Sequence, residues 1–176
     1  MNIKGSVALV TGANRGLGRA YVQALLDAGA KKVYAAARNP AMIDLPRVQP
    51  IKLDVTNPDD VAAAAKTYTD VNIVINNAGI MRSAPVVSGR IDQAAARAEM
   101  ETNFYGVLAM SSAFAPILKA NGGGALVNML SVLSWVTLPG VALYSASKAA
   151  AWSLTNALRK EFARPRVVSR SSLVAI

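Results

Sequence analysis

The alternation of short apolar runs with segments of helical periodicity predicts an α/β fold, a doubly wound parallel sheet of the Rossmann-like kind. The apolar runs lack a polar face, as expected of strands that are buried on both sides. A glycine-rich turn separates the first run from the first helical pattern and marks a strand that feeds its crossover helix. The strands are expected at residues 6–10, 32–37, 48–53, 71–75 and 125–130.

Helices are expected in the intervals between these runs. A helical pattern covers residues 19–28 and stops at Gly29, because glycine commonly ends helices. Residues 57–60, Asn-Pro-Asp-Asp, form a helix start with a cap, an early proline and acids at the positive end of the dipole. Two long helices are expected over residues 94–119 and from Tyr144 to about residue 163.

The composition describes a packed globular chain and limits its chemistry. Hydrophobic residues make up 53% of the 176 residues, and we expect one domain at residues 1–164 with a basic tail of atypical composition at 165–176. Cysteine and histidine are absent, so disulfides, thiolate metal sites and histidine-based triads are excluded and no metal site is expected. Acid–base chemistry must therefore come from Tyr, Lys, Asp or Glu.

The net charge of +9 is compatible with an anionic partner, either a phosphorylated cofactor or nucleic acid. Much of the excess lies in the last eighteen residues, and no interleaving of aromatic with basic residues supports nucleic-acid binding. No apolar run approaches the roughly 18 residues that span a bilayer. The short segment before the first strand leaves no room for a signal peptide, so a cytoplasmic location without membrane binding is expected.

The turn after the first strand carries the glycine pattern of a nucleotide site. Gly12, Gly16 and Gly18 follow the spacing Gly-x-x-x-Gly-x-Gly between a strand and a helix, and Asn14 and Leu17 lie within it. Residues without side chains make a tight turn that lets the amides of the helix N-terminus approach a pyrophosphate. The alternative is a glycine-rich turn that binds no ligand. No Gly-Lys-Ser/Thr follows, so a triphosphate loop is not expected.

The second strand ends without the acid that commonly holds a ribose 2′-hydroxyl. Ala37 occupies that place and Arg38 follows, while Arg15 adds a cation inside the glycine turn. Two guanidinium groups suit a 2′-phosphate, which favours NADP over NAD, unless Arg38 is simply a solvated side chain. Asp54, with Val55, ends the third strand and is either an adenine contact or an ordinary loop acid.

Tyr144 and Lys148 lie four residues apart after a loop that contains Pro139-Gly140. On a helix this spacing places the phenol and the ammonium on one face. A phenol titrates near ~10 in water, and a fixed cation beside it lowers that pKa toward the working range. A serine on the same wall could then hold a substrate oxygen. The alternative is a half-buried aromatic residue beside a solvated lysine.

Taken together, these motifs resemble those of the short-chain dehydrogenases/reductases over residues 5 to about 163. The segments that carry the resemblance are Thr11-Gly12-x-x-x-Gly16-x-Gly18, Asn76-Asn77-Ala78-Gly79, Asn103, Ser131 and Tyr144-Ser-Ala-Ser-Lys148. The resemblance implies that Tyr144 is the catalytic acid/base and that Ser131, rather than Ser134, orients a substrate carbonyl. It also implies that Lys148 binds the nicotinamide ribose and lowers the pKa of Tyr144, and that Asn103 anchors a proton-relay water.

The same resemblance implies further cofactor contacts and a reaction. Asp54 and Asn77 would border the adenine and its ribose, and Ala78 and Gly79 would also bind the cofactor. The implied reaction is NADP-dependent interconversion of a carbonyl and an alcohol by hydride transfer on a small-molecule substrate. A homodimer or homotetramer is implied through the two long helices. The alternative is a nucleotide-binding relative whose catalysis is impaired.

The chain departs from the family pattern after the helix that carries Tyr144. Val167-Val168 is the possible start of a further strand, but no Pro-Gly turn follows, and the tail resembles a truncated or frame-altered terminus. Arg170 and three serines make a poor buried strand. We therefore expect a sheet that lacks its usual last strands, an unpaired edge at residues 125–130, weak activity and a tendency to aggregate.

Overall fold

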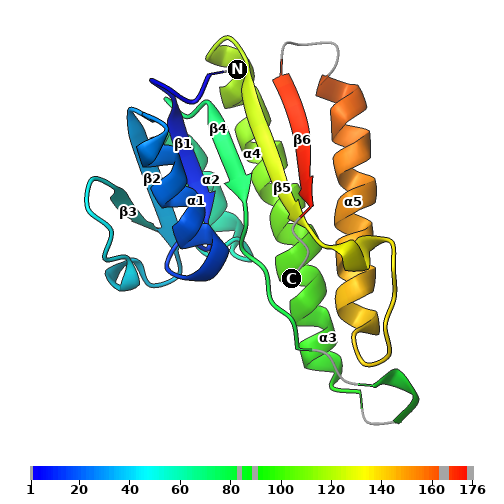
Figure 1. Cartoon of the computed structure of the whole chain (residues 1–176). Coiled ribbons are helices and arrows are strands. Elements are labelled where there is room, and N and C mark those ends of the chain that lie inside the picture. Colours follow the sequence, from blue (N-terminus) through cyan, green and yellow to red (C-terminus); the bar gives the residue numbers. More distant parts are fainter. Residues whose placement is uncertain (1, 83–84, 89–90, 163–166, 174–176) are drawn as a thin grey trace.

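The computed structural model describes residues 2–82, 85–88, 91–162 and 167–173, and these form a six-stranded parallel sheet with helices on both faces (Figure 1). The strands are β1 (Val7–Thr11), β2 (Lys32–Ala37), β3 (Gln49–Lys52), β4 (Ile73–Asn76), β5 (Gly124–Leu130) and β6 (Val167–Leu173). The α-helices are α1 (Gly16–Asp27), α2 (Pro58–Thr67), α3 (Gln93–Met100), α4 (Gly106–Ala120) and α5 (Ala142–Phe162).

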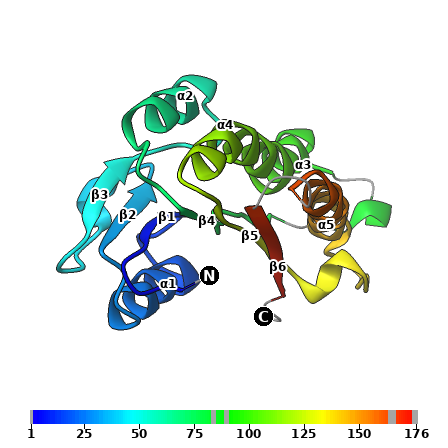
Figure 2. The same cartoon turned by 90° about the horizontal axis from the view of Figure 1, so that it is seen from above.

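The strand order β3-β2-β1-β4-β5-β6 places the reversal of winding between β1 and β4. Helix α1 lies on one face of the sheet, while α2, α4 and α5 cover the other (Figure 2). Val10 and Val22 are fully buried in the core under α1, and Leu9 and Phe114 in the core on the other face. In such sheets ligands bind in the crevice at the carboxyl ends of the strands, next to the reversal.

The expected strands are confirmed, with ends that differ by at most two residues, and so are the helices that follow β1, β3 and β5. Helix α1 begins at Gly16 rather than at Arg19, because the last glycines of the turn form its first turn. Helix α2 begins as expected: the Asn57 side chain accepts hydrogen bonds from the N–H groups of Asp59 and Asp60, and Pro58 opens the helix. No helix among the described residues is long and apolar enough to cross a membrane.

The long helix expected over residues 94–119 is interrupted. A π-helical segment, Glu101–Tyr105, connects α3 to α4, and Asn103 lies at its centre. π-Helical turns inside α-helices are rare and occur frequently at functional sites. Here the turn coincides with a side chain that bonds a neighbouring loop, so tertiary contacts interrupt a pattern that is regular in sequence.

The expectation of an unpaired edge at β5 is wrong. β6 pairs in parallel with β5 along its whole length, from Gly124 opposite Val167 to Leu130 opposite Leu173. The pairing uses backbone N–H and C=O groups, and charged or polar residues are common in strands at the edge of a sheet. The serines and the arginine of this segment therefore do not prevent a sixth strand.

Candidate active site

The glycine turn has the shape of a phosphate cradle. A Cβ atom on Gly18 would lie 2.1 Å from the carbonyl oxygen of Gly12, so only glycine allows α1 to approach the turn this closely. Gly12 and Gly16 have φ angles of 65° and 52°, which glycine adopts without strain. At the start of α1 no side chain caps the helix and no acid occupies its first turn. Its free amides fit the pyrophosphate of a dinucleotide.

Thr11 and Asn77 join the ends of β1 and β4 beside this turn. The Thr11 hydroxyl accepts hydrogen bonds from the N–H groups of Asn77 and Ala78, both at 3.0 Å. The Asn77 amide donates to the carbonyl oxygens of Thr11 at 2.9 Å and Gly12 at 3.2 Å. Asn77 therefore holds the glycine turn in place through these two hydrogen bonds. Thr11 was not among the expected site residues, although it begins the glycine motif.

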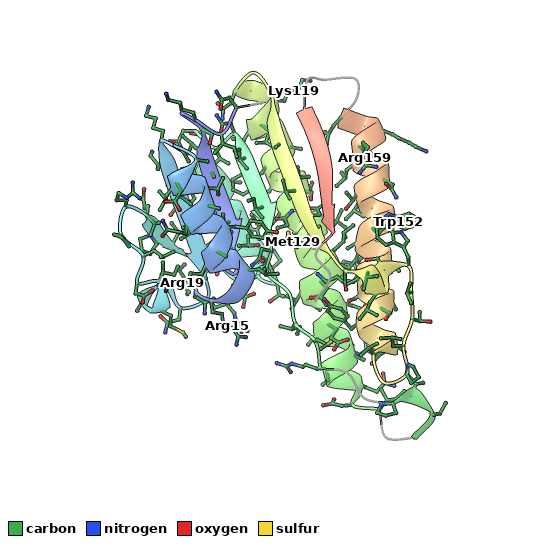
Figure 3. All side chains as sticks on the ribbon, in the orientation of Figure 1. Arg15, Arg19, Lys119, Met129, Trp152 and Arg159 are labelled. Atoms are coloured by element: carbon green, nitrogen blue, oxygen red, sulfur yellow. The ribbon has the colours of Figure 1, made fainter. Side chains whose placement is uncertain are left out.

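Two exposed arginines lie at this end of the sheet. Arg15 precedes α1 and Arg38 follows β2, and both side chains face solvent. Arg19 is instead engaged with Asp44 in an ion pair, and Figure 3 shows Arg15 and Arg19 at the same end of the molecule. Arg15 and Arg38 are thus two solvent-exposed cations next to the glycine turn and the end of β2.

Asp54 and Val55 follow β3 at the same edge. The Asp54 carboxylate accepts hydrogen bonds from the N–H and the hydroxyl of Thr56, at 3.0 and 2.8 Å, which fixes its orientation. Val55 is buried against Gly106, where an added Cβ would lie 2.7 Å from a Val55 methyl carbon. These contacts fix both residues at the carboxyl end of β3.

Ser131, at the end of β5, meets Tyr144 at the start of α5. Its hydroxyl accepts a hydrogen bond from the N–H of Leu133 at 3.2 Å and lies close enough to the Tyr144 phenol to lower the pKa of that phenol. Ser134, the alternative serine, has its hydroxyl bonded to the N–H of Ser131 at 3.4 Å and completes a capping box. Ser131, rather than Ser134, is therefore the serine that acts on the Tyr144 phenol.

Lys148 is the cation nearest to Tyr144 and is buried, with 6% of its surface exposed. Its ammonium donates to the carbonyl oxygen of Met129 on β5 at 2.8 Å, and Figure 3 labels that residue. The Nζ atom lies 5.7 Å from the centroid of the Tyr144 ring. Burial lowers the pKa of the Lys148 ammonium to about 8.

The pKa of Tyr144 differs from the expectation. Burial raises the pKa of the phenol above its ordinary value, the hydrogen bond with Ser131 lowers it, and the negative charge of Glu99 raises it. Lys148 was expected to lower this pKa, but its ammonium is directed to the Met129 carbonyl. In this arrangement Tyr144 is a protonated phenol, ready to donate a proton.

Asn103 connects the site to its surroundings and is fully buried. Its side-chain oxygen accepts from the N–H of Ile80 at 2.9 Å, and its amide donates to the Ile80 carbonyl at 2.8 Å and to the Ser147 hydroxyl at 3.0 Å. Ser147 in turn donates to the Tyr144 carbonyl at 2.7 Å. Ser147 thus belongs to the hydrogen-bond network that joins Asn103 to the helix of Tyr144. The sequence analysis did not single it out, although it lies between Tyr144 and Lys148.

We expect burial of Lys148 to make stability depend on pH. The pKa is about 8 in the folded state and near ~10.4 in the unfolded chain, so between these values the unfolded state binds more protons. The free energy of unfolding should therefore rise with pH in this window. Lys148→Met should lack this rise. The free energy of unfolding of the variant minus that of the parent should therefore be larger at about pH 7 than at about pH 9.5, by about 2 kcal/mol.

Urea unfolding of parent and variant at the two pH values measures this difference. Lys160→Met is the matched control, because Lys160 lies on the same helix and is exposed. Equal pH dependence in the parent and in Lys148→Met would contradict the prediction.

Comparison with known proteins shows the family. Residues 6–171 match the short chain dehydrogenase family. The 3-oxoacyl-(acyl-carrier-protein) reductase FabG of Vibrio cholerae is 34% identical over 172 residues, which cover 93% of this chain and 70% of that protein. A short chain dehydrogenase from Burkholderia cenocepacia, solved in complex with NADP, is 49% identical with a TM-score of 0.94, covering 99% of this chain and 74% of the other.

A relative that was solved with the other nicotinamide cofactor is also similar. The short chain dehydrogenase/reductase from Burkholderia phymatum in complex with NAD has a TM-score of 0.91 and 26% identity, covering 100% of this chain and 67% of the other. The chain belongs to the short-chain dehydrogenase family of oxidoreductases. Its relatives include proteins that hold NADP and proteins that hold NAD.

Proposed function

We propose that this protein is an NADP-dependent oxidoreductase that interconverts a carbonyl and an alcohol, with Tyr144 as acid/base. One observation carries the proposal: the Tyr144 phenol lies beside the Ser131 hydroxyl and the buried ammonium of Lys148 at the carboxyl ends of β4 and β5. The nearest catalytic alternatives, histidine and cysteine, do not occur in the chain. The arrangement suits proton transfer to a carbonyl oxygen.

Each side chain has a proposed task in carbonyl reduction. Ser131 would orient the substrate carbonyl by donating a hydrogen bond to its oxygen, and Tyr144 would donate its proton to that same oxygen. Lys148 would hold the ribose next to the nicotinamide and stabilise the phenolate that remains. The bound NADPH supplies the hydride. Because the side-chain amide of Asn103 is engaged by Ile80 and Ser147, we propose that a proton-relay water would use its backbone carbonyl.

The cofactor contacts follow from the phosphate cradle and its neighbours. The amides of the glycine turn would bind the pyrophosphate, and Asp54 would contact the adenine. Arg15 and Arg38 support NADP over NAD, because no acid follows β2 and a guanidinium pairs well with a phosphate. The residues proposed to line the cofactor are Gly12, Asn14, Arg15, Gly16, Leu17, Gly18, Arg38, Asp54, Val55, Asn77, Ala78, Gly79, Tyr144 and Lys148.

Steady-state oxidation of NADPH with a panel of aldehydes and ketones tests the reaction, with NADPH binding measured alongside. Turnover of any carbonyl with NADPH consumption supports the proposal. NADPH binding without turnover on the panel favours the alternative, a nucleotide-binding relative with impaired catalysis. Failure of both measurements contradicts both readings.

The pairing of β6 with β5 removes the ground on which an unpaired, aggregating edge was expected.

We expect Arg38→Asp to shift the cofactor preference from NADP toward NAD. The change replaces a partner for the 2′-phosphate with an acceptor for the 2′-hydroxyl, and one lost charged hydrogen bond corresponds to about ten- to a hundredfold in affinity. Dissociation constants for NADPH and NADH measure the ratio. Lys31→Asp is the control, since it makes the same charge change at an exposed position before β2. An NADPH/NADH ratio equal to that of the control would contradict the prediction.

We also propose assembly into a homodimer or homotetramer through α4 and α5. The support is a cavity of about 520 Å³ between these helices, whose lining includes Leu108, Ala115, Leu154 and Leu158. Leu108 and the neighbouring Tyr105 are 37% and 49% exposed, which leaves an apolar surface for a second copy to cover. Light scattering during size-exclusion chromatography measures the assembly, and Leu108→Lys should shift it toward the monomer.

A further inference from the structure

The site contains a buried acid that the proposed reaction does not use. Of the charged side chains that the structure describes, two are buried: Lys148, and Glu99 with 1% of its surface exposed. Neither of the two ion pairs found among the described residues includes Glu99. A buried carboxylate without a cationic partner is costly, so its retention in a folded protein calls for a specific contact.

That contact is the backbone of the loop after β4. One carboxylate oxygen of Glu99, Oε1, accepts a hydrogen bond from the N–H of Arg82, while Oε2 is buried without a partner among the described residues. Asn103 lies four residues further along the same helical stretch, so its side chain projects on the same side. It bonds both the N–H and the carbonyl of Ile80. Two side chains thus hold this loop at successive points.

The loop segment that they hold is a wall of the proposed active site. It continues from Gly79, where an added Cβ would lie 3.2 Å from Oδ1 of Asn103 and 3.5 Å from Nζ of Lys148. A side chain at position 79 would crowd Asn103, and movement of the segment away from the site would break the bonds to Glu99 and Asn103. Because Asn103 also bonds Ser147 of α5, the loop, the π-helical segment and the helix of Tyr144 form one connected unit.

We propose that Glu99 is a positioning residue of this site: its buried carboxylate, which accepts a hydrogen bond from the N–H of Arg82, fixes the loop from Asn77 to Arg82 beside Lys148. This inference rests on the proposed role of Tyr144 as acid/base. Burial is the main reason that the pKa of Tyr144 is raised, and the charge of Glu99 raises it further, against the hydrogen bond from Ser131. The ammonium of Lys148 lies 5.7 Å from the ring centroid of Tyr144.

The consequence is a bias in the direction of proton transfer. A negative charge near the phenol favours its protonated form, which is the form that donates to a carbonyl oxygen. Glu99 would thus keep Tyr144 a proton donor and oppose the formation of the phenolate that alcohol oxidation requires.

Two variants separate the two parts of the proposal. Glu99→Gln keeps an acceptor for the Arg82 N–H and removes the charge, whereas Glu99→Ala removes both. Glu101→Gln is the matched control, because it removes the same charge from an exposed side chain on the adjoining turn. Amide hydrogen exchange at Ile80 and Arg82 reports on the loop, and the carbon-13 signal of labelled tyrosine reports on ionisation of Tyr144, assigned with Tyr144→Phe.

In Glu99→Ala we expect exchange at Arg82 to accelerate by about ten- to a hundredfold, the value of one charge-assisted hydrogen bond. In Glu99→Gln exchange should stay within about threefold of the parent, while Tyr144 ionises at a lower pH, by about one unit or less. Glu101→Gln should match the parent in both measurements. The titration is followed over the pH range in which circular dichroism shows an intact fold.

The proposal is overturned if the Tyr144 signal of Glu99→Gln behaves as in Glu101→Gln, or if Glu99→Ala leaves exchange at Arg82 unchanged. If the Glu99 variants do not fold, the parent still decides: an Arg82 amide that exchanges as fast as an unstructured one excludes the bond to Glu99. These measurements need neither cofactor nor substrate. An enzyme assay without turnover would therefore contradict the proposed reaction and leave the test of Glu99 intact.

Discussion

Tyr144→Phe is expected to lower kcat for carbonyl reduction by about 100-fold or more, while the dissociation constant of NADPH stays within about twofold. The substitution removes the phenolic oxygen that would pass the proton and keeps the ring. The ring is what fills the space beside Lys148, whose Nζ lies 5.7 Å from its centroid. Transfer of the proton is therefore lost, and the cofactor contacts are kept.

Steady-state kinetics and NADPH binding on the same preparation test this separation of effects. Tyr68→Phe is the matched control, because Tyr68 ends α2 and stacks on Tyr34, away from the site. Parallel loss of turnover and of binding in Tyr144→Phe would show that the tyrosine holds the structure of the site instead of transferring a proton.

The sequence predicted those parts of the site that lie within one element or follow from a local motif. The spacing of Tyr144 and Lys148 requires only a helix, and α5 provides it. The choice of Ser131 over Ser134 rested on spacing alone, and the structure shows the physical difference: one hydroxyl meets the phenol and the other caps a turn. The glycine turn was equally readable, because its constraints are local to the backbone.

What the sequence did not reveal depends on burial and on contacts between distant elements. The pKa of Tyr144 was expected to fall because Lys148 is near. Burial of the phenol raises that pKa instead, and the spacing of two residues along the sequence does not reveal how deeply they are buried. In the sequence, nothing distinguishes Glu99 from an ordinary exposed helix residue. Its burial and its bond to the loop after β4 depend on how α3 packs in the folded chain. A full sixth strand was not expected, because Arg170 and the serines of this segment have a low strand propensity. β6 forms nevertheless, because its backbone pairs with that of β5.

Gly18→Ala is expected to weaken NADPH binding by about a hundredfold and to lower the free energy of unfolding by about 1–3 kcal/mol. The added methyl group would lie 2.1 Å from the carbonyl oxygen of Gly12 and 2.5 Å from Nδ2 of Asn77. The first contact is with backbone, which cannot rotate away, so α1 must move from the turn. Movement of the helix N-terminus displaces the amides that would bind the pyrophosphate, and it also strains the bonds of Asn77 to β1.

The control separates loss of stability from loss of the site. Gly122 has a φ angle of 81° with open space around its Cα, and it lies between α4 and β5 at the opposite end of the sheet. Gly122→Ala should lower stability by about 1–2 kcal/mol through backbone strain alone and leave the NADPH dissociation constant unchanged. Urea unfolding and nucleotide titration of both variants measure the two effects. If Gly18→Ala and Gly122→Ala bind NADPH equally well, the turn before α1 is not the place where the pyrophosphate is held.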